Sequence, residues 1–310
     1  MSNMPIPPVD EIKASYKEGN LREVARWLPH LRDNKSKFIK FLMESNILKM
    51  KEHINDPPIT LGADPEFILC KKDNKDEIVL FSSQFTSDYF GISEAEVGAD
   101  YGLLEFRPKP SNNADELVVE LNDLHDKFKE RYKGLDFKIL ESEAVEYNHK
   151  RARVLESLEE DKDINYGLNR GKDVGVWVPS GDEMITGQET GVSLSAYSKP
   201  SFNQFNDKLF TAGGHIHIGG TYIMMLSFKQ LRTFVQNLDK EVLPMCVGVE
   251  TKAGELRRSV YGSPGEFRIK NYGIEYRSPS NAIFWKKNSK KLLKVFNKVT
   301  KMVCGMALEV

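Results

Sequence analysis

The stretch AGGHIHIGG, residues 212–220, places one histidine on each side of an isoleucine. A pair of glycines lies near each end of the stretch, at 213–214 and at 219–220. Side chains alternate between the two faces of a β-strand, so residues two apart point the same way. In a strand, His215 and His217 therefore share one face and Ile216 lies on the other. The glycines leave room for a backbone or a ligand to approach closely. This stretch predicts a strand with an apolar face toward a core and an imidazole face directed away from it.

Three further segments show the same alternation of two ionisable residues around an apolar one. One such pair is common on the solvated face of an antiparallel sheet. These pairs together hold Asp, Glu, His and Arg but no Lys, which is unusual for a solvated face, so we expect the four strands to share one sheet and one functional face. The three pairs are Asp64 and Glu66 around Pro65, Glu105 and Arg107 around Phe106, and Glu275 and Arg277 around Tyr276.

The rest of residues 59–310 alternates short strands with a few amphipathic helices, which predicts an α+β fold. We expect a mainly antiparallel sheet with helices packed on the face opposite the ionisable pairs. The expected strands are 59–69, 77–83, 103–108, 136–146, 174–179, 211–222, 266–270 and 272–278. The expected helices follow Asn112 and Asn113, begin at Ser227 with a capping box to Gln230, and occupy the C-terminal region around Leu292, Leu293, Phe296, Val299 and Val303.

The chain is expected to divide into a helical appendage, residues 1–58, and a catalytic domain, residues 59–310. The appendage has a loose helical period broken by Gly19, Pro29 and Pro57. It carries no chemical motif, so we interpret it as a packing or oligomerisation element, with substrate recognition as the alternative. The polar, glycine-containing stretches 149–172 and 180–208 are typical of functional loops or lids.

Composition excludes several classes of protein. Lys and Arg number 44 against 45 for Asp and Glu, so no overall charge favours nucleic acid or a membrane surface. The N-terminus lacks a signal-peptide pattern and no run of eighteen apolar residues occurs, which predicts a cytoplasmic protein. Cys70, Cys246 and Cys304 are too few and too widely spaced for a disulfide scaffold or a four-cysteine zinc site, and we expect buried, inert thiols.

The expected polar face suits a hard divalent cation and phosphate. Four carboxylates with a minor imidazole contribution favour Mg²⁺ or Mn²⁺ over zinc. The segment 257–268 adds Arg257 and Arg268 on either side of a glycine turn, and guanidinium groups bind phosphate oxygens in pairs. Carboxylates, metal and arginines together meet the charge requirements of a nucleoside triphosphate. Surface ion pairs of these arginines with Glu255 and Glu266 are the alternative.

Other nucleotide and hydrolase motifs are absent from the sequence. There is no GxxxxGK[ST] loop, no GxGxxG fingerprint and no G-x-S-x-G elbow. A metallohydrolase built on His-x-His would need further histidines, and none follows His217. We interpret His30, His53, His125 and His149 as structural.

Four motifs in order resemble the phage-type carboxylate-amine ligases, the COOH-NH2 ligase type 2 branch of amidoligases within the glutamine synthetase and glutamate-cysteine ligase-like superfamily. The motifs are LGADPEF (61–67), VGADYGLLEFRP (97–108), AGGHIHIGG (212–220) and RRSVYGSPGEFRIKNYGIEYRSPSN (257–281). The resemblance spans about residues 59–285 and implies a glutamine synthetase-like catalytic domain. If the chain is phage-encoded, its compartment would be the host cytoplasm.

The resemblance also implies roles for individual residues. The implied metal ligands are Asp64, Glu66, Glu105, His215 and Glu275, and the implied catalytic residues are Arg268, Arg277 and Glu105. The residues predicted to bind the ATP cofactor are Arg107, His217, Arg257, Arg268 and Arg277. Asp100 falls at a turn of the family pattern and its role stays open.

The implied reaction has two steps: ATP phosphorylates a carboxylate to an acyl phosphate, and an amine then displaces phosphate to give an amide. The cofactors are ATP and Mg²⁺ or Mn²⁺, and the substrates are a small-molecule or peptide acid and amine, with a modified nucleotide still possible. The alternatives are a guanidino or carboxylate kinase on the same fold and a non-catalytic phage structural or regulatory protein.

Overall fold

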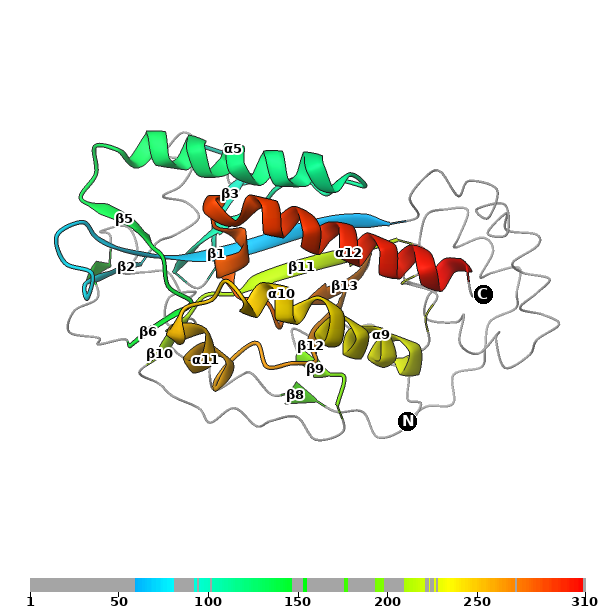
Figure 1. Cartoon of the computed structure of the whole chain (residues 1–310). Coiled ribbons are helices and arrows are strands. Elements are labelled where there is room, and N and C mark those ends of the chain that lie inside the picture. Colours follow the sequence, from blue (N-terminus) through cyan, green and yellow to red (C-terminus); the bar gives the residue numbers. More distant parts are fainter. Residues whose placement is uncertain are drawn as a thin grey trace, which may run out of the picture.

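In the computed structural model, the described residues are 59–80, 92–93, 95–100, 102–146, 193–197, 209–220, 228–270 and 272–308, with short pieces at 153–154, 176–177, 223 and 226. The predicted N-terminal appendage, residues 1–58, lies outside them. The described chain mixes α-helices with a mainly antiparallel sheet, as the sequence predicts (Figure 1).

One large sheet organises the described part of the chain. Its central strands follow the order β3-β4-β1-β11-β13-β12-β9-β8, β2 and β5 pair with the far end of β1, and β7 pairs with β2. The pairs β2 with β7 and β8 with β9 are parallel, and the other pairs are antiparallel. The strands are β1 (Thr60–Lys71), β2 (Ile78–Leu80), β3 (Val97–Asp100), β4 (Leu103–Phe106), β5 (Phe137–Leu140), β7 (Arg153–Val154), β8 (Val176–Trp177), β9 (Ser193–Ser195), β11 (Gly214–Gly219), β12 (Glu266–Lys270) and β13 (Gly273–Tyr276).

The four strands that carry or precede the ionisable pairs are neighbours in this sheet. They lie in the order β4, β1, β11, β13, although they are far apart in the sequence. The apolar residue between the members of each pair is buried on the opposite face, as expected from the alternation. Phe106, Ile216 and Tyr276 are each fully buried.

Helices cover that apolar face and form the core with it. They are α5 (Ala114–Tyr132), α9 (Phe228–Glu241), α10 (Leu243–Val247) and α12 (Ser289–Leu308), with the 3₁₀ turns η3 (Asn281–Phe284) and η4 (Lys286–Asn288). The short helix α11 (Lys252–Arg258) contributes no residue to this core and instead contacts the segment Ala144–Glu146. Phe106 on β4 packs edge-on against Phe128 of α5, and Tyr276 on β13 donates to Asp239 of α9. Figure 1 shows α12 running alongside the central strands. The helices therefore pack on the apolar face of the sheet, and the opposite face carries the ionisable pairs.

The predicted helices are confirmed where the structure describes them. Asn113 caps α5 by accepting a hydrogen bond from the Asp115 backbone N–H, and the apolar stripe of α5 is buried. The helix α9 begins at Phe228, and the predicted capping residue Ser227 lies outside the described residues. Among the helices of the described residues, none combines the length and apolar character needed to cross a bilayer.

Two predicted strands are wrong in extent. The segment 136–146 is not one strand but β5 followed by β6 (Ala144–Glu146), which pairs with β10 (Leu209–Thr211) in a separate two-stranded sheet. Between them the carboxylate of buried Glu143 accepts hydrogen bonds from Thr251, which draws the chain toward α11. The predicted strand 211–222 is likewise interrupted, because β11 begins only at Gly214.

Among the described residues, the short strands β3, β7 and β9 were not predicted, and only Thr211 of β10 falls within a predicted strand. The strands β7 and β9 lie inside the segments 149–172 and 180–208, most of which fall outside the described residues. Cys70 and Cys246 are buried as expected, whereas Cys304 is partly exposed, and burial raises the pKa of both buried thiols. His125 is structural as predicted: its ring packs against Phe67 and Phe106 in the core.

Candidate active site

The registers of three adjacent strands bring one aspartate, two histidines and one glutamate together. Asp64 on β1 lies opposite His215 on β11, and His217 lies opposite Glu275 on β13. Asp64 uses both of its oxygens: Oδ1 lies 2.9 Å from His215 Nδ1, and Oδ2 lies 3.0 Å from His217 Nε2. The alternation of the HIHI stretch therefore gives a shared carboxylate between two imidazoles.

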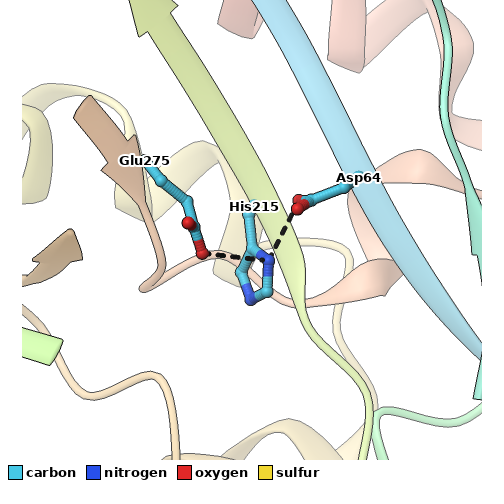
Figure 2. A group of neighbouring side chains, drawn as sticks. All are labelled: Asp64, His215 and Glu275. Carbon is cyan, nitrogen blue, oxygen red and sulfur yellow. Dashed lines mark ion pairs between the residues drawn. The ribbon is translucent and has the colours of Figure 1, made fainter. Parts of the chain in front are cut away.

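Asp64, His215 and Glu275 form the first of two groups suited to a metal ion. Figure 2 shows the His215 ring between the two carboxylates. Its Nδ1 lies 3.5 Å from Glu275 Oε1, and one donor atom from each of the three residues falls within 4.8 Å of the others. Two oxygens and one imidazole nitrogen are a donor set that Mg²⁺ or Mn²⁺ accepts.

The hydrogen bonding within this group also fits a cation. Among the described residues, Asp64 Oδ1 and His215 Nδ1 are buried without a hydrogen bond of acceptable geometry, although they face each other. Buried polar atoms in folded proteins nearly always have a partner. A divalent ion held by both atoms would satisfy them, so the residues present fit the metal that the sequence predicts.

Electrostatics separate the carboxylates of this group from an ordinary buried acid. Burial opposes ionisation of Asp64, but the neighbouring His217 and His215 outweigh it and hold the pKa of Asp64 well below its usual value. Burial likewise opposes ionisation of Glu275, but Arg277 and His215 lower its pKa, with a further contribution from Arg268. Both carboxylates are therefore anionic near neutral pH. Burial would lower the pKa of His217, yet Asp64 and Glu275 raise it.

Glu66, Asp100 and Glu105 form the second group, again with donor atoms within 4.8 Å of one another. Glu66 lies opposite Glu105 across β1 and β4, and Asp100 ends the adjacent strand β3. The carboxylates predicted to form one cluster, Asp64, Glu66 and Glu105, are separated into two groups, and Asp100, whose role was left open, belongs to the second. Glu66 is fully buried, and its Oε2 accepts a hydrogen bond of 2.6 Å from the Gly213 N–H.

Cations surround Glu275 from two strands. The Arg277 Nη1 donates a 2.5 Å hydrogen bond to Glu275 Oε1, Lys270 Nζ lies 2.8 Å from Oε2, and Arg268 Nη1 lies 3.7 Å from Oε1. The Arg277 side chain is only 2% exposed, whereas those of Arg268 and Lys270 are 28% and 36% exposed. Two of the three cations can therefore reach a ligand, while Arg277 is enclosed. Lys270 was not predicted from the sequence, although the alternation of Glu266, Arg268 and Lys270 along β12 places it on the same face as Arg268.

The other predicted arginines occupy different environments. Arg107 is 35% exposed and donates to Glu105 from the end of β4. Arg257 is fully buried, and its two Nη atoms donate to the backbone carbonyls of Ser278 and Arg277. The alternative of a surface ion pair does not describe Arg257; its neighbour Arg258 instead pairs with Glu250.

Two tyrosines that were not predicted as site residues contact the ring nitrogens of His215 and His217 that face away from Asp64. Tyr261 shares a 2.5 Å hydrogen bond with His215 Nε2, and Tyr272 shares one of 2.6 Å with His217 Nδ1. The Tyr272 ring also stacks on His217, with centroids 5.6 Å apart. Each imidazole therefore has Asp64 on one side and a phenol on the other.

Comparison with known proteins identifies part of the chain. Residues 180–306 match the model of the family described as phage phiEco32-like COOH.NH2 ligase-type 2. The predicted family is confirmed over this segment. The family name denotes an enzyme that joins a carboxylate to an amine. No curated protein and no solved structure matches the chain.

The segment that matches the family model contains one side of the site. It includes β11, β12 and β13, with His215, His217, Arg268, Glu275 and Arg277. The carboxylates of β1, β3 and β4 precede it in the sequence. They lie beside the matched segment through the pairing of β1 with β11.

Proposed function

We propose that this protein is an ATP-dependent carboxylate-amine ligase with a glutamine synthetase-like catalytic domain, which forms an amide through an acyl phosphate. The observation that carries the proposal is the meeting of a three-residue metal-donor group with three cationic side chains at one carboxylate, Glu275, inside a segment that matches a COOH-NH2 ligase family. A carboxylate that must attack the γ-phosphate of ATP faces Coulomb repulsion, and such a site relieves it.

We assign the divalent cations to the two donor groups. Asp64, His215 and Glu275 would hold one Mg²⁺ or Mn²⁺, and Glu66 and Glu105, with Asp100 beside them, would hold a second. A bound divalent cation supplies charge neutralisation for phosphate oxygens and orients them. Glu105, whose pKa is raised to about 8 by burial and by Asp64 and Asp100, would bind a cation only after losing its proton.

The exposed cations are assigned to the triphosphate. Arg268 and Lys270 project from β12 beside Glu275 and are accessible, so they would contact phosphate oxygens directly, and Arg107 would do so from the other side. Arg277 is enclosed, and we assign it mainly to holding Glu275 in place. For Arg257 we propose a supporting role beneath Arg277 instead of the direct ATP contact predicted from the sequence.

The two steps balance without another reactant. A substrate carboxylate oxygen bonds to the γ-phosphorus while the bond to the β-phosphate oxygen breaks and ADP leaves. The amine nitrogen then bonds to the acyl carbon, the carbon–oxygen bond to phosphate breaks, and the amine loses a proton. The cationic side chains around Glu275 stabilise the negative charge that develops on the transferred phosphoryl group.

The test is product analysis with pools of small-molecule and peptide acids and amines. We expect Mg²⁺-dependent release of ADP and phosphate, and with hydroxylamine in place of the amine we expect one hydroxamate for each ADP. A guanidino kinase would give ADP without hydroxamate. Stoichiometric AMP and pyrophosphate would reject the acyl-phosphate route. Glu275→Gln, which removes the charge shared by metal group and cations, serves as the inactive control.

A further inference from the structure

The hydroxyl of Tyr261 bridges the first metal-donor group and the enclosed arginine. It shares the 2.5 Å hydrogen bond with His215 Nε2 and accepts a hydrogen bond from Arg277 Nη2. Tyr261 is 4% exposed, so water does not easily replace either contact. A single buried hydroxyl thus contacts both His215, a member of the first metal-donor group, and Arg277, which pairs with Glu275.

The ring of Tyr261 is held in place independently of its hydroxyl. The guanidinium carbons of Arg257 and Arg277 lie 4.9 Å and 5.0 Å from its ring centroid, which favours cation–π attraction. Its backbone N–H donates to the Arg257 carbonyl at 2.8 Å. The following residue, Gly262, has a φ of 71°, and a Cβ there would lie 2.2 Å from Arg257 Nη1. The turn after α11 therefore fixes the phenol before any ligand binds.

This contact determines which nitrogen His215 presents to the two carboxylates. An imidazole that binds a metal through one nitrogen is oriented by the partner of the other nitrogen. Because Nε2 is engaged by Tyr261, Nδ1 is the nitrogen that faces Asp64 and Glu275. If the Tyr261 hydroxyl were removed, the His215 ring would lose the contact that holds this orientation. The Tyr261 ring would still have Arg257 and Arg277 beside it.

We propose that Tyr261 is a positioning residue that holds His215 with Nδ1 toward Asp64 and Glu275 and links this ring to Arg277, so that the metal position and the Glu275 side chain are set together. This inference rests on the proposed metal-dependent function. It assigns to Tyr261 no contact with substrate.

The variant Tyr261→Phe tests the proposal, because it keeps the ring and its two arginines and removes only the hydroxyl. The matched control is Tyr276→Phe, which also removes one buried hydroxyl, but on the opposite face of β13, where Tyr276 donates to Asp239. Binding of Mn²⁺ alone is measured by calorimetry, and the nitrogen coupling of bound Mn²⁺ by pulsed electron paramagnetic resonance. We expect Tyr261→Phe to weaken Mn²⁺ binding about tenfold and to reduce the histidine nitrogen signal, as loss of an outer hydrogen bond to a metal ligand does. Tyr276→Phe should keep both close to wild type.

The outcomes separate this inference from the proposed function. In one outcome, the wild-type protein binds Mn²⁺, Glu275→Gln abolishes this binding, and folded Tyr261→Phe keeps both the binding and the nitrogen coupling. This outcome would overturn the role of Tyr261 and leave the ligase proposal standing. No Mn²⁺ binding by the wild-type protein would reject both. Should Tyr261→Phe fail to fold, nitrogen NMR of the wild-type protein saturated with Mg²⁺ decides: we expect His215 protonated on Nε2, and a ring protonated on Nδ1 would overturn the proposal.

Discussion

Arg107 Nε donates a 2.5 Å hydrogen bond to Glu105 Oε1, and yet the pKa of Glu105 is raised to about 8. Burial is the main cause, and the negative charges of Asp64 and Asp100 add to it; together they outweigh the arginine. Glu275, by contrast, has cations on three sides and a lowered pKa. Removing the negative charge should therefore stabilise the folded protein at Glu105 and destabilise it at Glu275.

The variant Glu105→Gln should stabilise the metal-free protein at alkaline pH. The carboxyl has a pKa near 4.5 when unfolded and about 8 when folded, so its contribution to stability is present below pH 4.5 and is lost as pH rises through 8. The advantage of the Gln variant should grow across that window to on the order of 1–3 kcal/mol and then level off. Denaturant unfolding from pH 5 to 9 with a chelator measures it; equal pH slopes for the two proteins would contradict the shift of Glu105.

The variant Glu275→Gln should destabilise the metal-free protein at neutral pH. Its charge holds Arg277, which is buried, and removing one partner of a buried pair typically costs about 3–5 kcal/mol. Since the pKa of Glu275 is lowered in the folded state, this contribution is present above the unfolded value of 4.5 and is lost as pH falls through the folded value. We expect a folded variant that has lost Mg²⁺-dependent ATP turnover. A rise in melting temperature at pH 7 would mean that carboxylate repulsion dominates at this position.

The variant Arg268→Lys should impair catalysis more than stability. A single ammonium cannot reproduce the paired hydrogen bonds of a guanidinium, so we expect the KM for ATP to rise about tenfold or more. The side chain is 28% exposed, so the free energy of unfolding should change by less than about 0.5 kcal/mol. Arg131→Lys on the outer surface of α5 is the control for the chemical change alone. Wild-type kinetics in Arg268→Lys would remove Arg268 from the phosphate site.

The variant Gly213→Ala should disturb both metal-donor groups at once. A Cβ at this position would lie 2.4 Å from His215 Nε2 and 3.1 Å from Glu66 Oε2. We expect Mn²⁺ affinity and ATP turnover to fall at least tenfold. Gly134→Ala, where a Cβ would meet nothing within 4 Å, should leave both properties unchanged. If the two alanine variants behave alike, the close packing around Gly213 does not control the site.

The sequence predicts the face of each strand better than the neighbours of each strand. The alternation of His215, Ile216 and His217 is enough to predict which side chains point away from the core, because the period of a strand is two. Alternation does not specify register, so the division of the carboxylates into two groups could not be predicted. That division depends on β1 pairing with β11 at Asp64 and with β4 at Glu66.

The sequence also did not predict which charged side chains are buried. Arg257 and Arg268 look equivalent on either side of a glycine turn, but Arg257 is buried, and the backbone carbonyls of residues 277 and 278 accept hydrogen bonds from its guanidinium group. Tyr261 gave no signal at all, since a lone tyrosine in a turn is common and its two partners come from β11 and the end of β13. Such contacts arise from tertiary packing between distant segments.

The order of the strands also gives the site face a direction. Negative side chains gather at one edge, on β3, β4 and β1, where Arg107 is bound to Glu105, while Arg268 and Lys270 lie toward the other edge on β12. Separated charges of this kind produce an electric dipole across the face, which attracts an anion to one side and a cation to the other. Under the proposed function, a polyphosphate would be attracted toward β12 and a protonated amine toward β3 before either made a specific contact.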